Sequence, residues 1–243
     1  MGARTKGRVA ALLASVRRQL REAAEPDFAV GVRNFFREPV DPHGVRSHNL
    51  HRISSAVYRE VKGWPKAERD QFMVALWESG RLEEGVIVNH VYRRFSKEFG
   101  EREFAVFAGW LDRYVHNWAH CDGLASWLLA GAIRNQPRLI DKLAAWTKSK
   151  NRWRRRAAAV ALLQEAKAGR NTESIFEMCT LLRSDSDDMV QKGVGWILKE
   201  AYPKKPREVV EFLDEWRATA PRLLLRIAGE KMNARDRKWL LTK

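Results

Sequence analysis

The stretch RVAALLASVRRQL, residues 8–20, places apolar side chains three or four positions apart, the spacing of one helix face. The apolar residues of this face are Val9, Leu12, Leu13, Val16 and Leu20. Similar spacing recurs through most of the chain, whereas sustained alternation of apolar and polar residues, as in a strand, is hard to find. These patterns predict an all-α protein.

Glycine and proline breaks divide the chain into helices of roughly 10 to 20 residues. The expected helix pairs cover 45–62 with 66–79, 83–98 with 101–117, 123–134 with 137–149, 151–168 with 172–183, and 187–201 with 206–218. A repeat of roughly 35 to 40 residues is typical of HEAT-like or armadillo-type solenoids, which curve and bind ligands on the concave face. We therefore expect a single helical-repeat domain over residues 1–243 with a basic concave face. A compact helical bundle is the alternative.

The composition is strongly basic. Forty-five Lys and Arg against 30 Asp and Glu give a formal charge of +15 and a pI near 10.2. Such an excess favours nucleic acid as the partner, although an acidic protein also fits. No apolar run approaches the ~20 residues of a membrane span. The two cysteines, Cys121 and Cys179, are too few for a disulfide framework, and we expect a soluble cytoplasmic protein associated with the nucleoid.

An arginine cluster opens one of the expected helices, in the run NRWRRRA at residues 151–157. A helix N-terminus disfavours cations because its exposed N–H groups carry about half a positive charge. Phosphate would compensate for this cost, since helix N-termini and arginine forks both bind it. The alternative is a solvated basic face with Trp153 in the core.

A second segment, NWAHCDGLA at residues 117–125, places Trp118 four residues before Asp122. A catalytic carboxylate is one interpretation. The other is that Asp122 is an N-cap, because aspartate before an apolar helical run is a standard start signal.

A third segment, QKGVGWILKE at residues 191–200, places Gly193 and Gly195 in a helix beside Trp196. Glycine costs ~1 kcal/mol relative to alanine in a helix interior. Two glycines therefore indicate the close approach of a neighbouring helix or of a ligand.

Together, in this order and spacing, the three segments resemble the AlkD-like DNA alkylation-repair glycosylases, with weaker similarity in LWESGRLEE at residues 76–84. The resemblance covers most of the chain. It implies that Asp122 is the catalytic carboxylate, that Trp118 and Trp196 line the lesion groove, and that Arg156 grips the DNA backbone. Further DNA contacts are assigned to Arg152, Arg155, Lys192 and Lys199. Lys199 stands where family members often carry arginine, so only a point-charge contact is expected there.

An early-helix aromatic residue of the family has no clear match, and Phe35 or Phe36 is the nearest candidate. The activity implied by the resemblance is hydrolysis of the N-glycosidic bond of cationic 3- or 7-alkylated purines in duplex DNA, by a monomer without cofactor. One carboxylate suffices for such substrates, because a leaving purine that is already cationic needs no acid. Tryptophan faces would favour the charged lesion.

Two other classes of function stay open. A non-catalytic helical-repeat module would bind nucleic acid or an acidic protein through the same basic face, but it would gain nothing from Asp122, which repels phosphate. A metal-dependent hydrolase has little support, because the six histidines lack carboxylate partners at recognised metal spacing. His116 and His120 share an i,i+4 offset without a clear third ligand, so we expect no metal.

Overall fold

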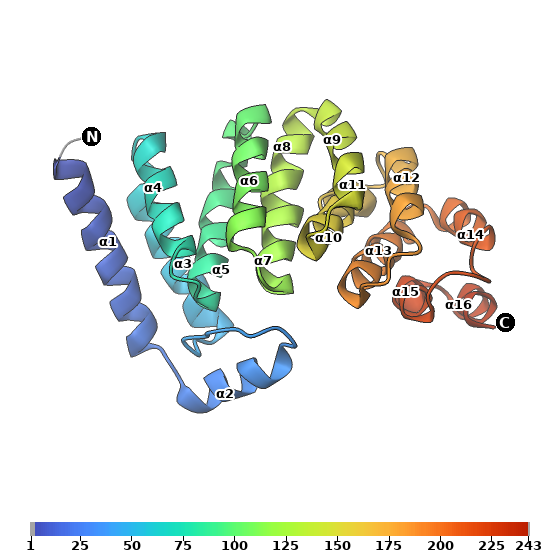
Figure 1. Cartoon of the computed structure of the whole chain (residues 1–243), viewed down its shortest axis with the longest axis horizontal. Helices are drawn as coiled ribbons and strands as arrows, with labels where there is room; N and C mark the ends of the chain where they lie inside the picture. The colour runs from blue at the N-terminus through green and yellow to red at the C-terminus, as the bar shows by residue number, and fades with distance from the viewer. Residues whose placement is uncertain (1–2, 243) are drawn as a thin grey trace. The chain divides into compact units, whose positions relative to one another are not determined.

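Helices and short turns form the described part of the chain (Figure 1). The computed structural model describes residues 3–242, with side chains from Gly7 onward. Within this range no strand forms, and extended pairing is limited to isolated bridges. The prediction of an all-α protein is confirmed. Contacts divide the chain into two compact units, Met1–Glu98 and Phe99–Lys243, called here the N-terminal and C-terminal units.

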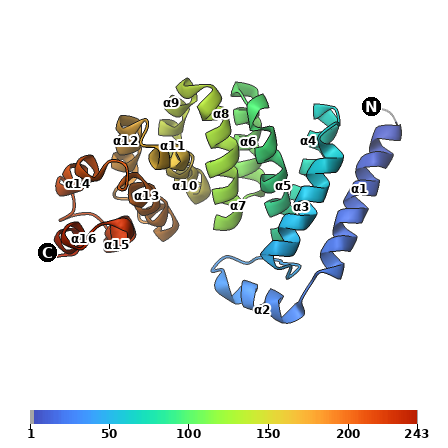
Figure 2. The same cartoon turned by 180° about the vertical axis from the view of Figure 1, so that it is seen from behind.

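The N-terminal unit contains five α-helices and a 3-10 turn. They are α1 (Ala3–Glu22), α2 (Pro26–Phe35), α3 (Ser47–Val61), α4 (Lys66–Trp77), α5 (Leu82–Tyr92) and η1 (Arg93–Glu98). Helix α1 packs on α3 and α4, and α5 packs on α3 and α4. Helix α2 lies across the ends of this layer in both views (Figures 1 and 2). Fully buried Leu20, Ile53, Phe72 and Ile87 form part of the core, as the helical apolar spacing requires.

The loop between α2 and α3 is fixed by one buried carboxylate. Glu83 accepts hydrogen bonds from the backbone N–H groups of His43 at 2.8 Å, Gly44 at 2.9 Å and Val45 at 3.0 Å. Gly44 adopts a left-handed φ of 84°, and a Cβ there would stand 2.6 Å from the Glu25 carbonyl oxygen. Only glycine fits that position, and the loop therefore holds His43 against α5.

The C-terminal unit continues as short helices. Its α-helices are α6 (Glu101–Tyr114), α7 (Trp118–Gly123), α8 (Ala130–Asn135), α9 (Asp141–Ala144), α10 (Arg152–Val160), α11 (Leu163–Ala168), α12 (Thr172–Leu182), α13 (Asp188–Ala201), α14 (Pro206–Asp214), α15 (Arg222–Ala228) and α16 (Ala234–Leu241). Shorter segments are the π-helix η2 (Leu124–Leu129) and the 3-10 turns η3 (Pro137–Ile140), η4 (Ala145–Lys148) and η5 (Gly229–Lys231).

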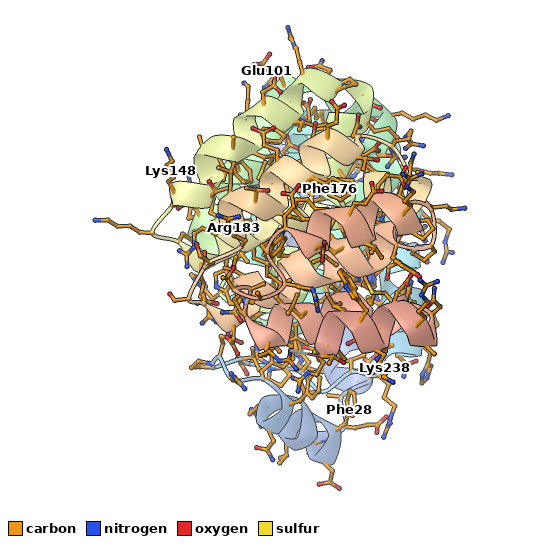
Figure 3. The ribbon with its side chains drawn as sticks, turned by 90° about the vertical axis from the view of Figure 1, so that its right-hand side faces the viewer. Phe28, Glu101, Lys148, Phe176, Arg183 and Lys238 are labelled. Atoms are coloured by element: carbon orange, nitrogen blue, oxygen red, sulfur yellow. The ribbon has the colours of Figure 1, made fainter. Side chains whose placement is uncertain are left out.

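Packing within this unit centres on α10 and α13. Helix α10 contacts α7 on one side and α13 on another, and α13 also packs on α15 and α11. Farther along, the stacked rings of Phe176 and Phe212, with centroids 4.3 Å apart, join α12 to α14 (Phe176 is labelled in Figure 3). Trp118, Arg156 and Trp196 are thus carried by three helices linked through α10.

Most of the expected helix pairs form close to the predicted bounds, but two segments differ. The helix expected at 123–134 begins earlier, because α7, η2 and α8 run on continuously from Trp118 to Asn135. The helix expected at 151–168 is interrupted by a turn at residues 161–162, between α10 and α11.

Candidate functional site

Asn117, rather than Asp122, caps the start of α7. The Asn117 side-chain oxygen accepts a hydrogen bond from the His120 backbone N–H at 2.9 Å. Asp122 lies four residues farther on than Trp118, inside the helical segment, so its interpretation as an N-cap is wrong. Asparagine and aspartate both cap helices well, but the helix begins directly after Asn117 and not after Asp122. The Asp122 side chain is therefore available for other contacts, on the same helix face as half-buried Trp118.

Asp122 and Arg156 form a bidentate ion pair. Arg156 Nε donates to Asp122 Oδ1 at 2.7 Å, and Arg156 Nη2 donates to Asp122 Oδ2, also at 2.7 Å. This fork geometry fixes both oxygens of the carboxylate at once. The pair brings together two of the residues that the sequence motifs single out, from helices α7 and α10.

The pair is largely removed from solvent. The Arg156 side chain is 6% exposed and that of Asp122 is 15% exposed. Arg156 Nη1 also donates to the Met189 carbonyl oxygen in the first turn of α13. Arg156 thus joins three helices, and removing one partner of such a buried pair typically costs about 3–5 kcal/mol.

A widened helical turn follows Asp122 directly. Residues Leu124–Leu129 form a π-helix, and the Ser126 hydroxyl donates to the Asp122 carbonyl oxygen at 2.7 Å. Single π-helical turns inside α-helices are frequent at functional sites. The local backbone therefore departs from regular α-helix right after the carboxylate.

Carboxylates of the protein itself balance the arginine cluster at the start of α10. Besides the Asp122–Arg156 pair, the ion pairs are Arg152–Asp187 at 2.9 Å, Arg154–Asp112 at 2.8 Å and Arg155–Asp185 at 2.6 Å. Trp153 is buried, as one alternative expected, but these arginines are not a solvated face. Aspartates from neighbouring segments thus compensate for the cluster within the protein. Phosphate contacts by Arg152, Arg155 and Arg156 stay predictions.

Helix packing accounts for the two glycines of α13. A Cβ on Gly193 would stand 3.3 Å from Arg156 Cγ, and a Cβ on Gly195 would stand 2.8 Å from the Leu224 carbonyl oxygen. Gly193 therefore lets the stem of Arg156 pass along α13, while Gly195 lets α15 approach. Of the two interpretations, close helix packing is confirmed at both positions. Trp196, half-buried, follows directly on the same helix.

The two predicted lysine contacts also have acidic neighbours. Lys192 Nζ lies 3.5 Å from Asp188, one turn before it, and Lys199 Nζ lies 2.8 Å from Glu230. The early aromatic candidate Phe35 lies on α2 of the N-terminal unit and is 72% exposed. The motifs did not identify the aspartates that pair with the arginines, because no local pattern marks them.

The described residues contain six histidines and two cysteines but no cluster that suits a metal. No group of three or more His, Cys, Asp or Glu side chains there could hold a metal ion. The buried His120 side chain instead faces its capping residue, with Nδ1 3.2 Å from Asn117 Nδ2. In the same part of the chain, no helix combines the length and apolarity needed to cross a bilayer.

Comparisons with known proteins place the chain in a family. A family model described as DNA alkylation repair enzyme matches residues 16–232. The solved structure of a predicted DNA alkylation repair enzyme from Enterococcus faecalis is similar, with a TM-score of 0.76, 17% identity, and coverage of 87% of this chain and 97% of that one. The protein smu.31 from Streptococcus mutans UA159 is also similar, with a TM-score of 0.56, 17% identity, and coverage of 76% and 100%.

No curated protein matches the chain. The two structural likenesses support the predicted helical-repeat fold, and the family match spans most of the sequence. The chain therefore belongs to the DNA alkylation repair enzyme family.

Proposed function

We propose that this protein is a monofunctional DNA glycosylase that releases cationic 3- or 7-alkylated purines from duplex DNA. The observation that carries the proposal is the bidentate Asp122–Arg156 pair, which fixes a carboxylate one helical turn after Trp118. Family membership supports a repair reaction on DNA, and the fixed carboxylate supports glycosidic cleavage.

The chemistry needs a single carboxylate. In an alkylated purine nucleotide the bond between C1′ and the base nitrogen breaks, and its electron pair returns to the cationic base, which leaves neutral. Positive charge then develops on the sugar as an oxocarbenium-like state. Asp122 would stabilise that charge and orient a water molecule, whose oxygen bonds to C1′ while its proton is lost to the carboxylate or to solvent.

Arg156 would act as a positioning residue for this step. Because both carboxylate oxygens of Asp122 accept from one rigid guanidinium, the side chain has little freedom to rotate. A preoriented charge stabilises a transition state without reorganising during the reaction. The contact with the Met189 carbonyl oxygen fixes Arg156 in turn.

Trp118 and Trp196 would contact the lesion. An aromatic face attracts a nearby cation by roughly 0.5–2 kcal/mol, which favours an alkylated base over a neutral one. Lys192 and Lys199, with Arg152, Arg155 and Arg156, would contact the phosphate backbone of duplex DNA. The formal charge of +15 supports binding to a polyanion.

The test is base release from a duplex that contains one 7-methylguanine. The wild-type protein should release the methylated base, and Asp122→Asn should lose most of this activity, at least about 100-fold by analogy with removal of one electrostatic group. Asp112→Asn is the matched control, because Asp112 also pairs with an arginine of α10 but lies outside the predicted site. Circular dichroism and duplex binding show whether each variant folds.

Two outcomes would contradict the proposal. Wild-type rates in Asp122→Asn would remove this carboxylate from the mechanism. Duplex binding by the wild-type protein without release of 3- or 7-alkylated purines would instead identify a non-catalytic DNA-binding module.

A further inference from the structure

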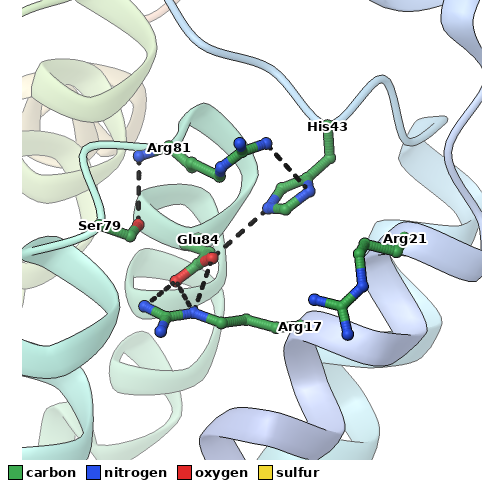
Figure 4. A pocket seen from close by; sticks show the side chains of 6 residues that line it. All are labelled: Arg17, Arg21, His43, Ser79, Arg81 and Glu84. Carbon is green, nitrogen blue, oxygen red and sulfur yellow. Dashed lines mark hydrogen bonds and ion pairs between the residues drawn. The ribbon is translucent and has the colours of Figure 1, made fainter.

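A basic pocket lies within the N-terminal unit, formed by segments distant in sequence. It has a volume of about 370 Å³ and is lined by Arg17, Arg21, His43, Ser79, Arg81 and Glu84 (Figure 4). Helix α1 supplies the first two arginines, and α5 supplies the carboxylate. The loop that Glu83 fixes supplies His43. None of these residues belongs to the proposed base-release site.

A buried carboxylate orients one wall of the pocket. The Glu84 side chain is 1% exposed, and its Oε2 lies 3.1 Å from Arg17 Nη2. Arg17 Nη2 also donates to the Ala75 carbonyl oxygen at 3.3 Å. His43 Nε2 lies 3.4 Å from Glu84 Oε1. Burial opposes the charge of Glu84, but hydrogen bonds from His43 and Arg17 and the charge of Arg17 lower its pKa.

The lining contains more positive than negative charge. Three arginines and one carboxylate line it, and that carboxylate is already engaged by Arg17 in a two-pronged contact. Arg81 lies 3.4 Å from exposed Asp41, and its Nη1 is also 3.4 Å from His43 Nδ1. The ion pair between Arg81 and Asp41 is therefore long and exposed to solvent.

Arg21 adds a like charge next to Arg17. The two are four residues apart on α1, so they share a helix face, where like charges destabilise by roughly 0.2–0.5 kcal/mol. The C-terminal end of α1 offsets part of this cost, because cations are favoured there. The preference for cations at the end of α1 does not explain why Arg81 approaches from the opposite wall of the pocket. In Figure 4 the Arg21 guanidinium points toward the space between Arg17 and His43.

An adjoining cavity extends the pocket. It has a volume of about 440 Å³ and shares Arg21, His43 and Arg81 with the first. It adds Arg33, the carboxylate of Asp41 and an apolar wall of Ala24, Pro26, Ala29, Val30 and Pro42. A ligand that fills both cavities would combine an anionic group with a larger, partly apolar part.

We propose that this pocket binds a phosphate group, with Arg21 and Arg81 as its donors and the charge of Arg17 beside them, and that the adjoining cavity accepts the organic part of a nucleotide. Guanidinium groups suit phosphate because they are planar, permanently charged and able to donate two parallel hydrogen bonds. The phosphate belongs either to a free mononucleotide or to the backbone of bound DNA, and its recognition is the same in both. The proposal does not depend on base release.

The first test is calorimetric binding of 2′-deoxyadenosine 5′-monophosphate, with 2′-deoxyadenosine as the probe that lacks phosphate. Arg21→Gln keeps most of the stem of an exposed residue and should weaken binding of the monophosphate about tenfold, the effect of one charge-assisted hydrogen bond. Arg18→Gln is the matched control, because it removes the same charge three residues earlier on α1, from a side chain outside the pocket. We expect the control to bind like the wild type.

The second test distinguishes the two sources of phosphate. If the mononucleotide does not bind, undamaged duplex DNA should bind more weakly to Arg21→Gln than to Arg18→Gln, with a salt slope lower by about 0.9. That result would assign the pocket to the DNA backbone. Equal behaviour of the two variants toward both probes, or measurable binding of 2′-deoxyadenosine that equals that of its monophosphate, would overturn the proposal. Because both tests measure binding, failure of the proposed glycosylase activity would leave them unaffected.

Discussion

Gly195 of α13 lies against the backbone of Leu224 in α15, so closely that a Cβ on the glycine would stand 2.8 Å from the Leu224 carbonyl oxygen. A backbone atom in a packed helix cannot move aside as a flexible side chain can. This contact sets how near α15 lies to the helix that carries Trp196.

Replacing Gly195 by alanine should destabilise the protein. Overpacking typically costs about 1–3 kcal/mol, and the better helix propensity of alanine returns at most ~1 kcal/mol. We expect a net loss of about 1–2 kcal/mol in the free energy of unfolding, measured by urea denaturation. Gly193→Ala is the comparison, since its Cβ meets the movable stem of Arg156 at 3.3 Å. Gly193→Ala should lower the free energy of unfolding less than Gly195→Ala does, and it should lower the rate of base release more. The opposite ranking of the two variants would contradict this packing.

Arg156→Ala should weaken binding to damaged and undamaged duplexes alike. A phosphate contact carries no base identity, and each lost contact lowers the salt slope of log K by at most about 0.9 for B-DNA. The measurement is affinity against salt concentration, on matched duplexes with and without a stable alkylpurine analogue. Arg154→Ala is the control, because Arg154 belongs to the same cluster but pairs with Asp112. An unchanged slope would limit Arg156 to the positioning of Asp122.

Stability should depend on pH through His90. This side chain is buried, its ring stacks on His51 with centroids 4.5 Å apart, and burial, with the charges of His51, Arg93 and Arg94, lowers its pKa to about 4. The unfolded chain takes up the proton first, near pH 6.5, so the free energy of unfolding falls as the pH drops from about 6.5 to about 4.

Urea denaturation at pH 7 and pH 5 measures this effect. We expect a loss of about 2 kcal/mol that His90→Gln abolishes, because glutamine takes up no proton. His48→Gln, at an exposed position of α3, should keep the full loss. The same pH dependence in wild type and His90→Gln would show that other groups cause it.

Base release should not respond to chelators. A cationic leaving group needs no Lewis acid, and Asp122 pairs with an arginine in the structure. The measurement is release of 7-methylguanine before and after treatment with EDTA. Inactivation that a divalent ion reverses would overturn the mechanism.

The sequence predicted those features of the fold that local chemistry determines. Gly169 ends α11 in a left-handed conformation, and Pro137 and Pro206 stand in the first turns of η3 and α14. Glycine and proline restrict or permit backbone conformations at their own positions, so their places in the sequence predict helix ends. The helix around Asp122 was placed too late, at residue 123 instead of Trp118, because Asp122 as well as Asn117 offers a start signal. The π-helix that follows has no such local signal.

The motifs named the residues of the candidate site but not their arrangement, and the roles of Trp118 and Trp196 stay predictions. Trp118, Asp122, Arg156 and Trp196 came from motif positions. The pairing of Asp122 with Arg156 spans 34 positions and depends on how α7 packs on α10. Carboxylates such as Asp112 and Asp185 carry no motif, so the neutralisation of the arginine cluster was missed.

The arginine–aspartate pairs of α10 bear on how DNA binding should scale with salt. A phosphate that approaches Arg152 or Arg155 meets a guanidinium already joined to an aspartate. When the phosphate binds, it replaces the aspartate as the partner of the arginine. The displaced carboxylate stays beside the polyanion and retains a counterion of its own. Fewer ions are set free than there are arginines at the interface, so the salt slope should undercount the arginines that touch the duplex.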